Sequence, residues 1–313
     1  MADGHIPCGI EIPQVFIGGP VDSEHIRKFV TRAEELDYDS LWVQERNLSN
    51  FSMLEPVTLM TYVAALTNRL KIGCSVLLTV VRNPLQLAKS LASLDQLSGG
   101  RIITGIGLGG VRGRMWPESE TVYGYSSERR VTRFVEGIRI MKALWQEEQV
   151  SFEGRFWSFT DVAMEPKPAQ QPFPLWFGGH AEPALRRAVA LGDGFMGAGS
   201  SPTERFVKEY ERITRFLDET GRDPATFAVS KRVYLAVDDD RDRAERRLRE
   251  FFAVRYRNAD LASQVCIWGG RQEIVDKLNE VVRAGARHLL LNPAFDEMEH
   301  LELLAEDVVP HLR

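Results

Sequence analysis

Three glycines near residue 105 are the first candidates for ligand chemistry in this sequence. Gly105, Gly107 and Gly110 lie in GGRIITGIGLGG (99–110), follow a β-type run and satisfy the spacing G-x-G-x-x-G. In a dinucleotide site, such glycines open a helix whose N-terminus faces the pyrophosphate. Here about 15 residues separate Gly110 from the Ser126–Ser127 helix cap, and no acidic residue ends a strand about 20 positions later. The spacing therefore argues against a dinucleotide fingerprint.

A second glycine pair has the context of an anion site. Gly178 and Gly179 lie between the β-type run PLWFGG and a helix predicted over 181–191. The backbone N–H groups at the start of a helix have no partner within it, and the helix dipole favours a negative charge there. The pair therefore predicts an anion site, with a plain strand-to-helix turn as the alternative.

These residues must be positioned by elements that alternate regularly along the chain. Eight β-type runs are each followed by an amphipathic helix, and one more helix over 271–284 precedes the last strand. Such alternation predicts a parallel sheet with right-handed crossovers, and eight units match a (β/α)8 TIM barrel. A doubly wound sheet carries its glycines in the first unit, whereas here they lie in the fourth. The expected strands are CGIEIP, DSLWV, RLKIGCSVLLT, RIITGIG, PLWFGG, GFMGAG, FAVSKRVYLAV and HLLLN.

Two insertions interrupt the alternation. The segment 147–172 contains a predicted β-hairpin that turns at Glu153–Gly154. The segment 112–125 is an extended loop at the C-terminal face, and its aromatic residues offer a lid or substrate wall: Trp116, Tyr123 and Tyr125. We expect one barrel domain over residues 1–313.

The barrel also predicts where chemistry is absent. Active sites of this fold lie at the C-terminal ends of the strands. Lys231 and Arg232 fall near the start of the seventh strand, so we expect them at the opposite end, and a Schiff base on Lys231 is not favoured.

Composition narrows the class of protein. The chain has 313 residues, is 44% hydrophobic and carries a formal charge of −5, which argues against broad binding to nucleic acid or an anionic membrane. No apolar run approaches the roughly 18 residues of a membrane span, and the first residues lack the pattern of a signal peptide. Three scattered cysteines and six histidines without ligand spacing predict no disulfide framework and no metal site. We expect a reduced, cytoplasmic protein that acts on a small molecule.

Three long segments resemble one known family. AEELDYDSLWVQE (33–45), LKIGCSVLLTVVRNPLQLAKSLASLDQLSGGRIITGIGLGG (70–110) and PLWFGGHAEPALRRAVALGDGFM (174–196) are similar to the luciferase-like flavin and deazaflavin oxidoreductases, the superfamily of bacterial luciferase-like monooxygenases. The resemblance covers almost the whole chain. It implies a TIM-type barrel that holds FMN or the deazaflavin coenzyme F420 at its C-terminal mouth, and a homodimer.

The resemblance also implies where a cofactor would lie. In the family, the ring rests on a bulge in the third strand, often with a non-prolyl cis peptide, and the matching residues here are Cys74, Ser75, Val76 and Leu77. Gly107 and Gly109 match positions along the ring and ribityl side. The phosphate position of the family matches Gly178, Gly179 and His180.

The end of the second strand departs from the best-known deazaflavin members, which carry an Asp–His pair where this chain has Glu45–Arg46. We expect Glu45 to accept a hydrogen bond from the cofactor. Arg46 stays charged, so we expect it to bind an anionic substrate group or to stabilise developing negative charge, with a surface ion pair as the alternative. Some members of the family carry an acidic residue just after the fourth-strand glycines, where this chain has Gly110. The resemblance therefore does not identify the residue that protonates the substrate.

Together these features predict an oxidoreductase that transfers a hydride between bound coenzyme F420 and a small organic substrate. One alternative is an FMN-dependent monooxygenase, in which reduced flavin activates oxygen. The other is a flavin-binding protein without catalysis. Binding of F420 or of FMN distinguishes the F420-dependent enzyme from the FMN-dependent monooxygenase. Substrate-dependent reduction or oxidation distinguishes either enzyme from a flavin-binding protein without catalysis.

Overall fold

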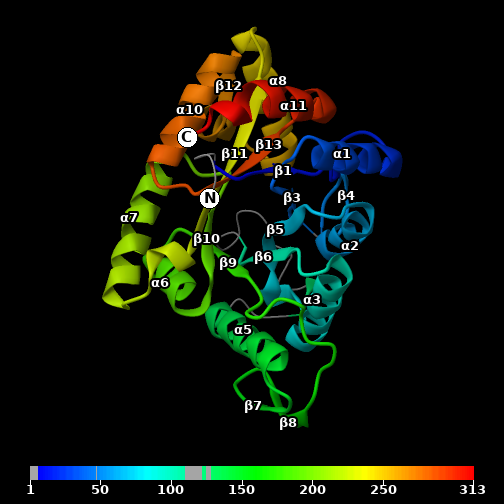
Figure 1. Ribbon diagram of the computed structural model, residues 1–313, viewed down its shortest axis with the longest axis vertical. Helices are drawn as coiled ribbons and strands as arrows, with labels where there is room; N and C mark the ends of the chain where they lie inside the picture. Colours follow the sequence, from blue (N-terminus) through cyan, green and yellow to red (C-terminus); the bar gives the residue numbers. More distant parts are fainter. Residues whose placement is uncertain (1–5, 47, 110–121, 125–127) are drawn as a thin grey trace.

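Eight parallel strands close into a barrel in the computed structural model, which describes residues 6–46, 48–109, 122–124 and 128–313 (Figure 1). Neighbouring strands pair in sequence order, including β10 with β11, and the first strand pairs with the last, which closes the barrel. This confirms the predicted TIM barrel. The barrel strands are β1 (Cys8–Glu11), β3 (Ser40–Val43), β5 (Lys71–Leu78), β6 (Ile102–Gly107), β9 (Leu175–Gly178), β10 (Gly194–Gly197), β11 (Ala228–Val237) and β13 (His288–Pro293).

Each barrel strand leads into a helix on the outside (Figure 1). The first helix buries the face formed by Ile26, Phe29, Val30 and Ala33, and Asp22 caps it by accepting from the His25 N–H, as the helical spacing and cap chemistry predict. The helices are α1 (Ser23–Glu35), α2 (Pro56–Leu66), α3 (Pro84–Ser98), α5 (Arg130–Gln146), α6 (Glu182–Leu191), α7 (Thr203–Glu219), α8 (Arg241–Tyr256) and α11 (Glu297–Leu303).

Shorter elements decorate this frame. The predicted hairpin is present as β7 (Val150–Glu153) and β8 (Ser158–Val162), which project beside α5, and the predicted extra helix is α10 (Arg271–Arg283). Three strands were not predicted: β2 (Val15–Phe16) and β4 (Ser52–Met53), which pair with each other, and β12 (Ile267–Gly269), which pairs in parallel with the end of β11. Short turns complete the chain: η1 (Thr79–Val81), η2 (Pro224–Thr226), η3 (Ala259–Leu261) and α9 (Ala262–Val265).

The closing helix is less regular than expected. The alternation predicts one amphipathic helix after the last strand, but α11 ends at Leu303 and continues as a π-helical turn (Leu304–Val308) and a 3-10 turn (Val309–His311). Pro310 lies in the last turn and has no N–H to donate. The prediction of one regular helix was therefore wrong after Leu303.

One indole fills the middle of the barrel. Trp42 is fully buried, and a Cβ on Gly9 or Gly73, in the strands on either side, would lie 2.4 Å from its ring atoms. The Trp42 ring packs 5.5 Å from that of Trp176, with Ile103, Met196 and Leu290 in the same cluster. Because side chains alternate along each strand, Trp42 inside the barrel also places Ser40 and Gln44 inside.

Below this indole, a buried histidine should make the fold acid-sensitive. His288 lies between the Ser40 and Ser230 hydroxyls, at 3.0 and 2.6 Å. Burial lowers its pKa to about 4, against the attraction of Asp39. The unfolded chain then binds the proton first as the pH falls, so the stability that neutral His288 contributes is present above pH 6.5 and is lost towards pH 4.

We expect the difference in unfolding free energy between wild type and His288→Gln to shrink by about 3 kcal/mol between pH 7 and pH 4. Urea unfolding at both pH values measures it, and His311→Gln, near the C-terminus, is the control. A difference that does not change with pH would contradict the assignment.

Within the described part of the chain, no helix has the length and apolar character needed to cross a membrane. The same residues contain no group of three or more His, Cys, Asp or Glu side chains arranged to hold a metal ion.

Candidate active site

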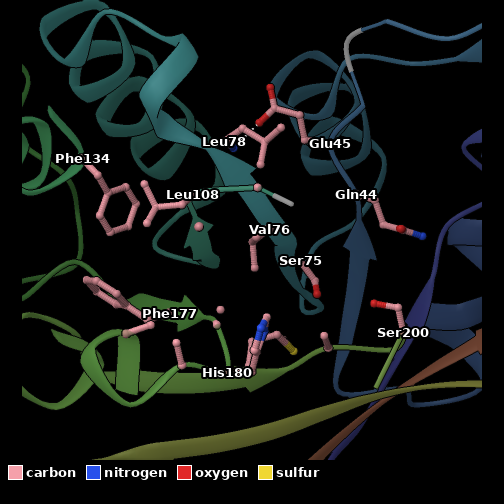
Figure 2. A pocket seen from close by; sticks show the side chains of 18 of the residues that line it. Gln44, Glu45, Ser75, Val76, Leu78, Leu108, Phe134, Phe177, His180 and Ser200 are labelled. Carbon is pink, nitrogen blue, oxygen red and sulfur yellow. Dashed lines mark hydrogen bonds between the residues drawn. The ribbon is translucent and has the colours of Figure 1, made fainter. Parts of the chain in front are cut away.

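A cavity of about 520 Å³ opens at the C-terminal ends of the strands (Figure 2), within the range of about 300–1,000 Å³ usual for small-molecule sites. Figure 2 shows Val76 in its wall, with Phe134 and Phe177 on one side of the view and Gln44 and Ser200 on the other. Eight of the eleven residues expected at the site line this cavity: Glu45, Ser75, Val76, Gly107, Gly109, Gly178, Gly179 and His180.

The end of β5 has the irregular geometry that the resemblance implies. Its register against β6 shifts between Cys74 and Leu77, and the Ser75–Val76 peptide bond is cis. The irregularity turns Ser75 and Val76 to the cavity. The Cys74 and Leu77 side chains are instead buried in the hydrophobic core.

The strand-end glycines make room for Val76. A Cβ on Gly107 would lie 2.7 Å from Val76 Cγ2, and one on Gly178 would lie 3.2 Å from Val76 Cγ1. Glycine at these two positions therefore allows close packing of β6 and β9 against the bulge. Gly109 has φ +75°, a conformation that disfavours any side chain.

The start of α6 forms the opposite wall. Gly179, His180 and Ala181 line the cavity just before this helix, and its cap residue Ala181 has no side-chain hydrogen bond to the first turn. Pro183 has no N–H, and the Ala184 N–H donates to the Ala181 carbonyl at 2.8 Å, so it is the helix dipole that favours an anion here. Arg187 of the same helix also lines the cavity. The predicted anion site therefore has a helix N-terminus and a nearby cation.

Several guanidinium groups around the cavity have hydrogen-bond donors without acceptors among the described residues. Arg187, Arg232 and Arg255 line the cavity, and in the described structure the Nε of each is buried without a hydrogen-bond partner. Arg130, at the start of α5, lines it as well. A buried donor without an acceptor is costly, so this cavity suits a ligand that carries several negative charges or acceptor oxygens.

The expectation that Arg232 lies away from the site was wrong. The strand β11 is ten residues long, and Arg232 is in its middle rather than at its far end. Its Nη1 donates to the Ser75 carbonyl at 2.9 Å, and its Nη2 donates to the Tyr256 hydroxyl at 3.1 Å. Lys231 points the other way and donates to the Ala198 and Ser201 carbonyls.

A polar network missed by the sequence analysis lies beside Arg232. Gln44 donates from Nε2 to Glu11 Oε1, and its Oε1 accepts from Arg255 Nη2 at 2.9 Å. Burial raises the pKa of the Glu11 carboxyl above its ordinary value, against the lowering effects of Arg232, Gln44 and Arg255. The second Glu11 oxygen is buried and has no partner among the described residues. Glu11 is therefore a carboxyl group poised to hold or release a proton.

Glu45 lines the cavity but already has strong partners. Its carboxylate accepts from the Leu78 N–H and from Arg82, with distances of 3.1 Å to Nε and 2.6 Å to Nη2. Arg82 also contacts Glu55 at 2.7 Å. The Glu45 side chain is 0% exposed. The geometry thus makes Glu45 a support for the end of β5, next to the bulge.

We expect Glu45→Gln to lower the free energy of unfolding by about 2–3 kcal/mol, because it removes a buried charge-assisted partner of Arg82 and of the Leu78 N–H. Denaturant unfolding measures this. Glu35→Gln, at an exposed helix position, is the control and should stay within about 0.5 kcal/mol. Equal stability of both variants would contradict the supporting role.

Arg46 is not a surface residue. It is buried, its Nη1 donates to the Arg255 carbonyl at 2.6 Å, and its guanidinium lies 5.1 Å from the centre of the Phe51 ring. Burial lowers its pKa to about 10. These contacts tie the segment after β3 to the end of α8, so the alternative of a surface ion pair was wrong. The role of Arg46 towards a substrate stays a prediction.

The loop expected to act as a lid, 112–125, lies outside the described residues except for 122–124. Gly110, the position of the missing family acid, is also outside them.

The fold and the site define the class: a (β/α)8 barrel with an arginine-lined cavity beside a bulged third barrel strand. The model of one family, described as luciferase-like monooxygenase, matches residues 11–288. The chain therefore belongs to the luciferase-like monooxygenase family, and the expectation of an enzyme of this family is confirmed.

Known relatives span nearly the whole chain. The chain is 27% identical to an F420-dependent glucose-6-phosphate dehydrogenase from Amycolatopsis mediterranei, over 94% of this chain and 95% of that protein. It is also 27% identical to a protein of the same name from Kineococcus radiotolerans, over 91% and 92%.

Solved structures share the fold. An F420-dependent secondary alcohol dehydrogenase in complex with an F420-acetone adduct superimposes with a TM-score of 0.84 at 19% identity, covering 99% of both chains. The oxygenating constituent of 3,6-diketocamphane monooxygenase from Pseudomonas putida, in complex with FMN, gives 0.75 at 17% identity, covering 98% of this chain and 99% of that one. Proteins named for either cofactor therefore have this barrel.

Proposed function

We propose that this enzyme transfers a hydride between bound coenzyme F420 and a small organic substrate. The observation that carries the proposal is the cavity lined by Arg130, Arg187, Arg232 and Arg255. F420 carries a phosphodiester and a chain of glutamate carboxylates, so it brings more negative charge than FMN. The F420-dependent relatives that span almost the whole chain support the same choice.

The residues present fit this group. Three buried guanidinium Nε atoms in the wall have no acceptor in the described structure, and an anionic ligand would supply acceptors. Ser75 and Val76, with Gly107 and Gly109, would hold the ring side. The N-terminal wall of α6, with Gly178, Gly179, His180 and Arg187, would hold the phosphate.

When bound, F420 supplies a ring carbon that accepts or returns a hydride, and the protein supplies orientation and charge. An alcohol that loses a hydride from carbon must also lose its O–H proton to become a carbonyl compound. Glu11 is the residue that we assign to take this proton, because its second oxygen is buried without a partner and it lies one side chain from the cavity, through Gln44. In the opposite direction, the same carboxyl returns the proton.

Glu45 and Arg46, the pair expected to be catalytic, take supporting roles in this proposal. Glu45 holds the end of β5 through Leu78 and Arg82. Arg46 holds Arg255, whose side chain lines the cavity, through the Arg255 carbonyl.

Side-by-side calorimetric titration of the purified apoprotein with F420 and FMN tests the proposal. We expect F420 to bind at least about tenfold more tightly, which is about 1.4 kcal/mol. Arg187→Met should weaken F420 binding by about tenfold or more, because a charge-assisted hydrogen bond is lost. The control is Arg215→Met, at a half-exposed position on α7.

Each outcome has a definite meaning. Tight binding of FMN alone would replace the proposal by the FMN-dependent monooxygenase alternative. Binding of neither cofactor would contradict the cofactor assignment. Binding of F420 without any substrate-dependent reduction or oxidation would favour a non-catalytic protein.

A further inference from the structure

A second cavity, of about 340 Å³, opens at the same end of the barrel. Its wall includes Glu11, the last residue of β1, and Asn292, near the end of β13, and these two strands pair side by side. Gln44 lines both this cavity and the first one. The two cavities are therefore neighbours at the mouth, and the second is large enough for a small molecule.

The unused hydrogen-bonding atoms in this wall are acceptors. Gln14 donates to the Gln44 and Leu54 carbonyls and accepts from the Gln44 N–H, so its amide is fully engaged. Two buried oxygens remain without partners in the described structure, Glu11 Oε2 and Asn292 Oδ1. Because leaving buried polar atoms unpaired is costly, a ligand with O–H or N–H groups would stabilise this wall.

The charge of the second cavity is opposite to that of the first. Its charged lining residues are Glu11, Asp296 and Glu297, and its described lining includes no lysine, arginine or histidine. Arg247 pairs with Asp296, but it lies outside the lining and covers the Phe295 ring at 3.8 Å. A phosphate or carboxylate placed here would meet three carboxyl groups and no cation in the described lining.

The remaining wall is apolar and aromatic. Phe16, Phe251 and Phe295 line the cavity, together with Ile12 and Ala294. A ligand that fits this lining has an apolar body and presents its donor group to the Glu11 and Asn292 side.

We propose that the second cavity is the substrate subsite and that it takes a neutral or cationic molecule with a hydroxyl or amino group on an apolar body, and not a phosphorylated sugar. Its role as a substrate subsite rests on the proposed function. Its ligand preference rests on the cavity lining alone. The enzyme would therefore differ in substrate class from relatives named for glucose 6-phosphate.

The test compares a matched pair of ligands, benzyl alcohol and benzyl phosphate, by saturation-transfer NMR and calorimetry. Inorganic phosphate is present throughout, so that the arginine-lined cavity is occupied in every titration. We expect benzyl alcohol to bind the wild-type protein at least tenfold more tightly than benzyl phosphate. Asn292→Leu should weaken alcohol binding by about tenfold, and Phe251→Trp, which narrows the cavity, should do the same.

Thr104→Val is the matched control. Thr104 carries another buried hydroxyl without a partner in the described structure, but it lies outside both cavity linings. Its loss should leave alcohol binding unchanged. Thermal unfolding of each variant shows whether it is folded, and Phe251→Trp keeps the test open if Asn292→Leu does not fold.

Three results would overturn the subsite: no alcohol binding, benzyl phosphate binding as tightly as the alcohol, or full alcohol affinity in both cavity variants. A parallel F420 titration separates this inference from the proposed function. Alcohol binding without F420 binding would keep the ligand preference and contradict the proposed function. F420 binding with efficient reduction by glucose 6-phosphate would keep the function and overturn the substrate class.

Discussion

Replacing Glu11 by glutamine should lower kcat by a factor of about 10² to 10⁴, the usual contribution of a positioned proton carrier, and leave F420 affinity unchanged. Glutamine has the same shape, and its oxygen can still accept from Gln44 Nε2, as Glu11 Oε1 does. It cannot take up or release a proton. The variant therefore removes the proton transfer and keeps the packing at the end of β1.

The pH profile distinguishes this loss from a structural effect. Burial raises the pKa of Glu11 above its ordinary value, so substrate oxidation by wild type should increase with pH as the carboxyl ionises. Glu11→Gln should lose this rising limb. Glu24→Gln, on the exposed face of α1, should keep both the rate and the profile. A Glu11→Gln enzyme with full kcat and an unchanged profile would show that another group carries the proton.

The barrel could be predicted from the sequence because its signals are local. Hydrophobic spacing and cap residues define α1 within 13 residues, and side-chain caps recur at α2, α3 and α8. The strand β12 was missed because Ile267–Gly269 is too short to show any period. The last helix was predicted to be too long because its apolar pattern continues through the π-helical turn. Pro310 is the local signal against a regular helix there.

The site was predicted where its residues follow one another in the chain. The bulge at Ser75–Val76 and the pair Gly178–Gly179 are short segments that a family resemblance preserves. The network of Glu11, Gln44 and Arg255 comes instead from β1, the end of β3 and α8, and its hydrogen-bonded residues are up to 211 positions apart. No local pattern links these residues, so they emerge only when the barrel closes.

The position of Arg232 could have been predicted from the sequence, because the alternation of side chains along its strand is a usable signal. In SKRVYL (230–235), alternation places Ser230, Arg232 and Tyr234 on one face of β11, and a TIM barrel makes that face either the interior or the helix layer. The contact of Ser230 with His288 shows that it is the interior. Its position near the start of the strand predicts that Arg232 lies far from the site. Because β11 is ten residues long, Arg232 lies in its middle and lines the cavity.

Arg232 is also expected to bias the cofactor towards its reduced state. A hydride carries one negative charge, so a ring that accepts it gains that charge. The Arg232 guanidinium lines the cavity, contacts the Ser75 carbonyl at 2.9 Å and has a buried Nε without a partner in the described structure. A cation held in a buried site favours the more negative form of its ligand.

Arg232→Met should therefore weaken binding of reduced F420 about 10²-fold more than binding of oxidised F420, which is about 2.7 kcal/mol. Anaerobic titration with both forms measures the difference, and Arg232→Lys should recover part of it because it keeps the charge. The fold should tolerate the change, since the Tyr234 and Tyr256 hydroxyls still pair at 2.9 Å. If both forms lose affinity equally, Arg232 acts only by holding the Ser75 carbonyl, and its charge has no part in hydride transfer.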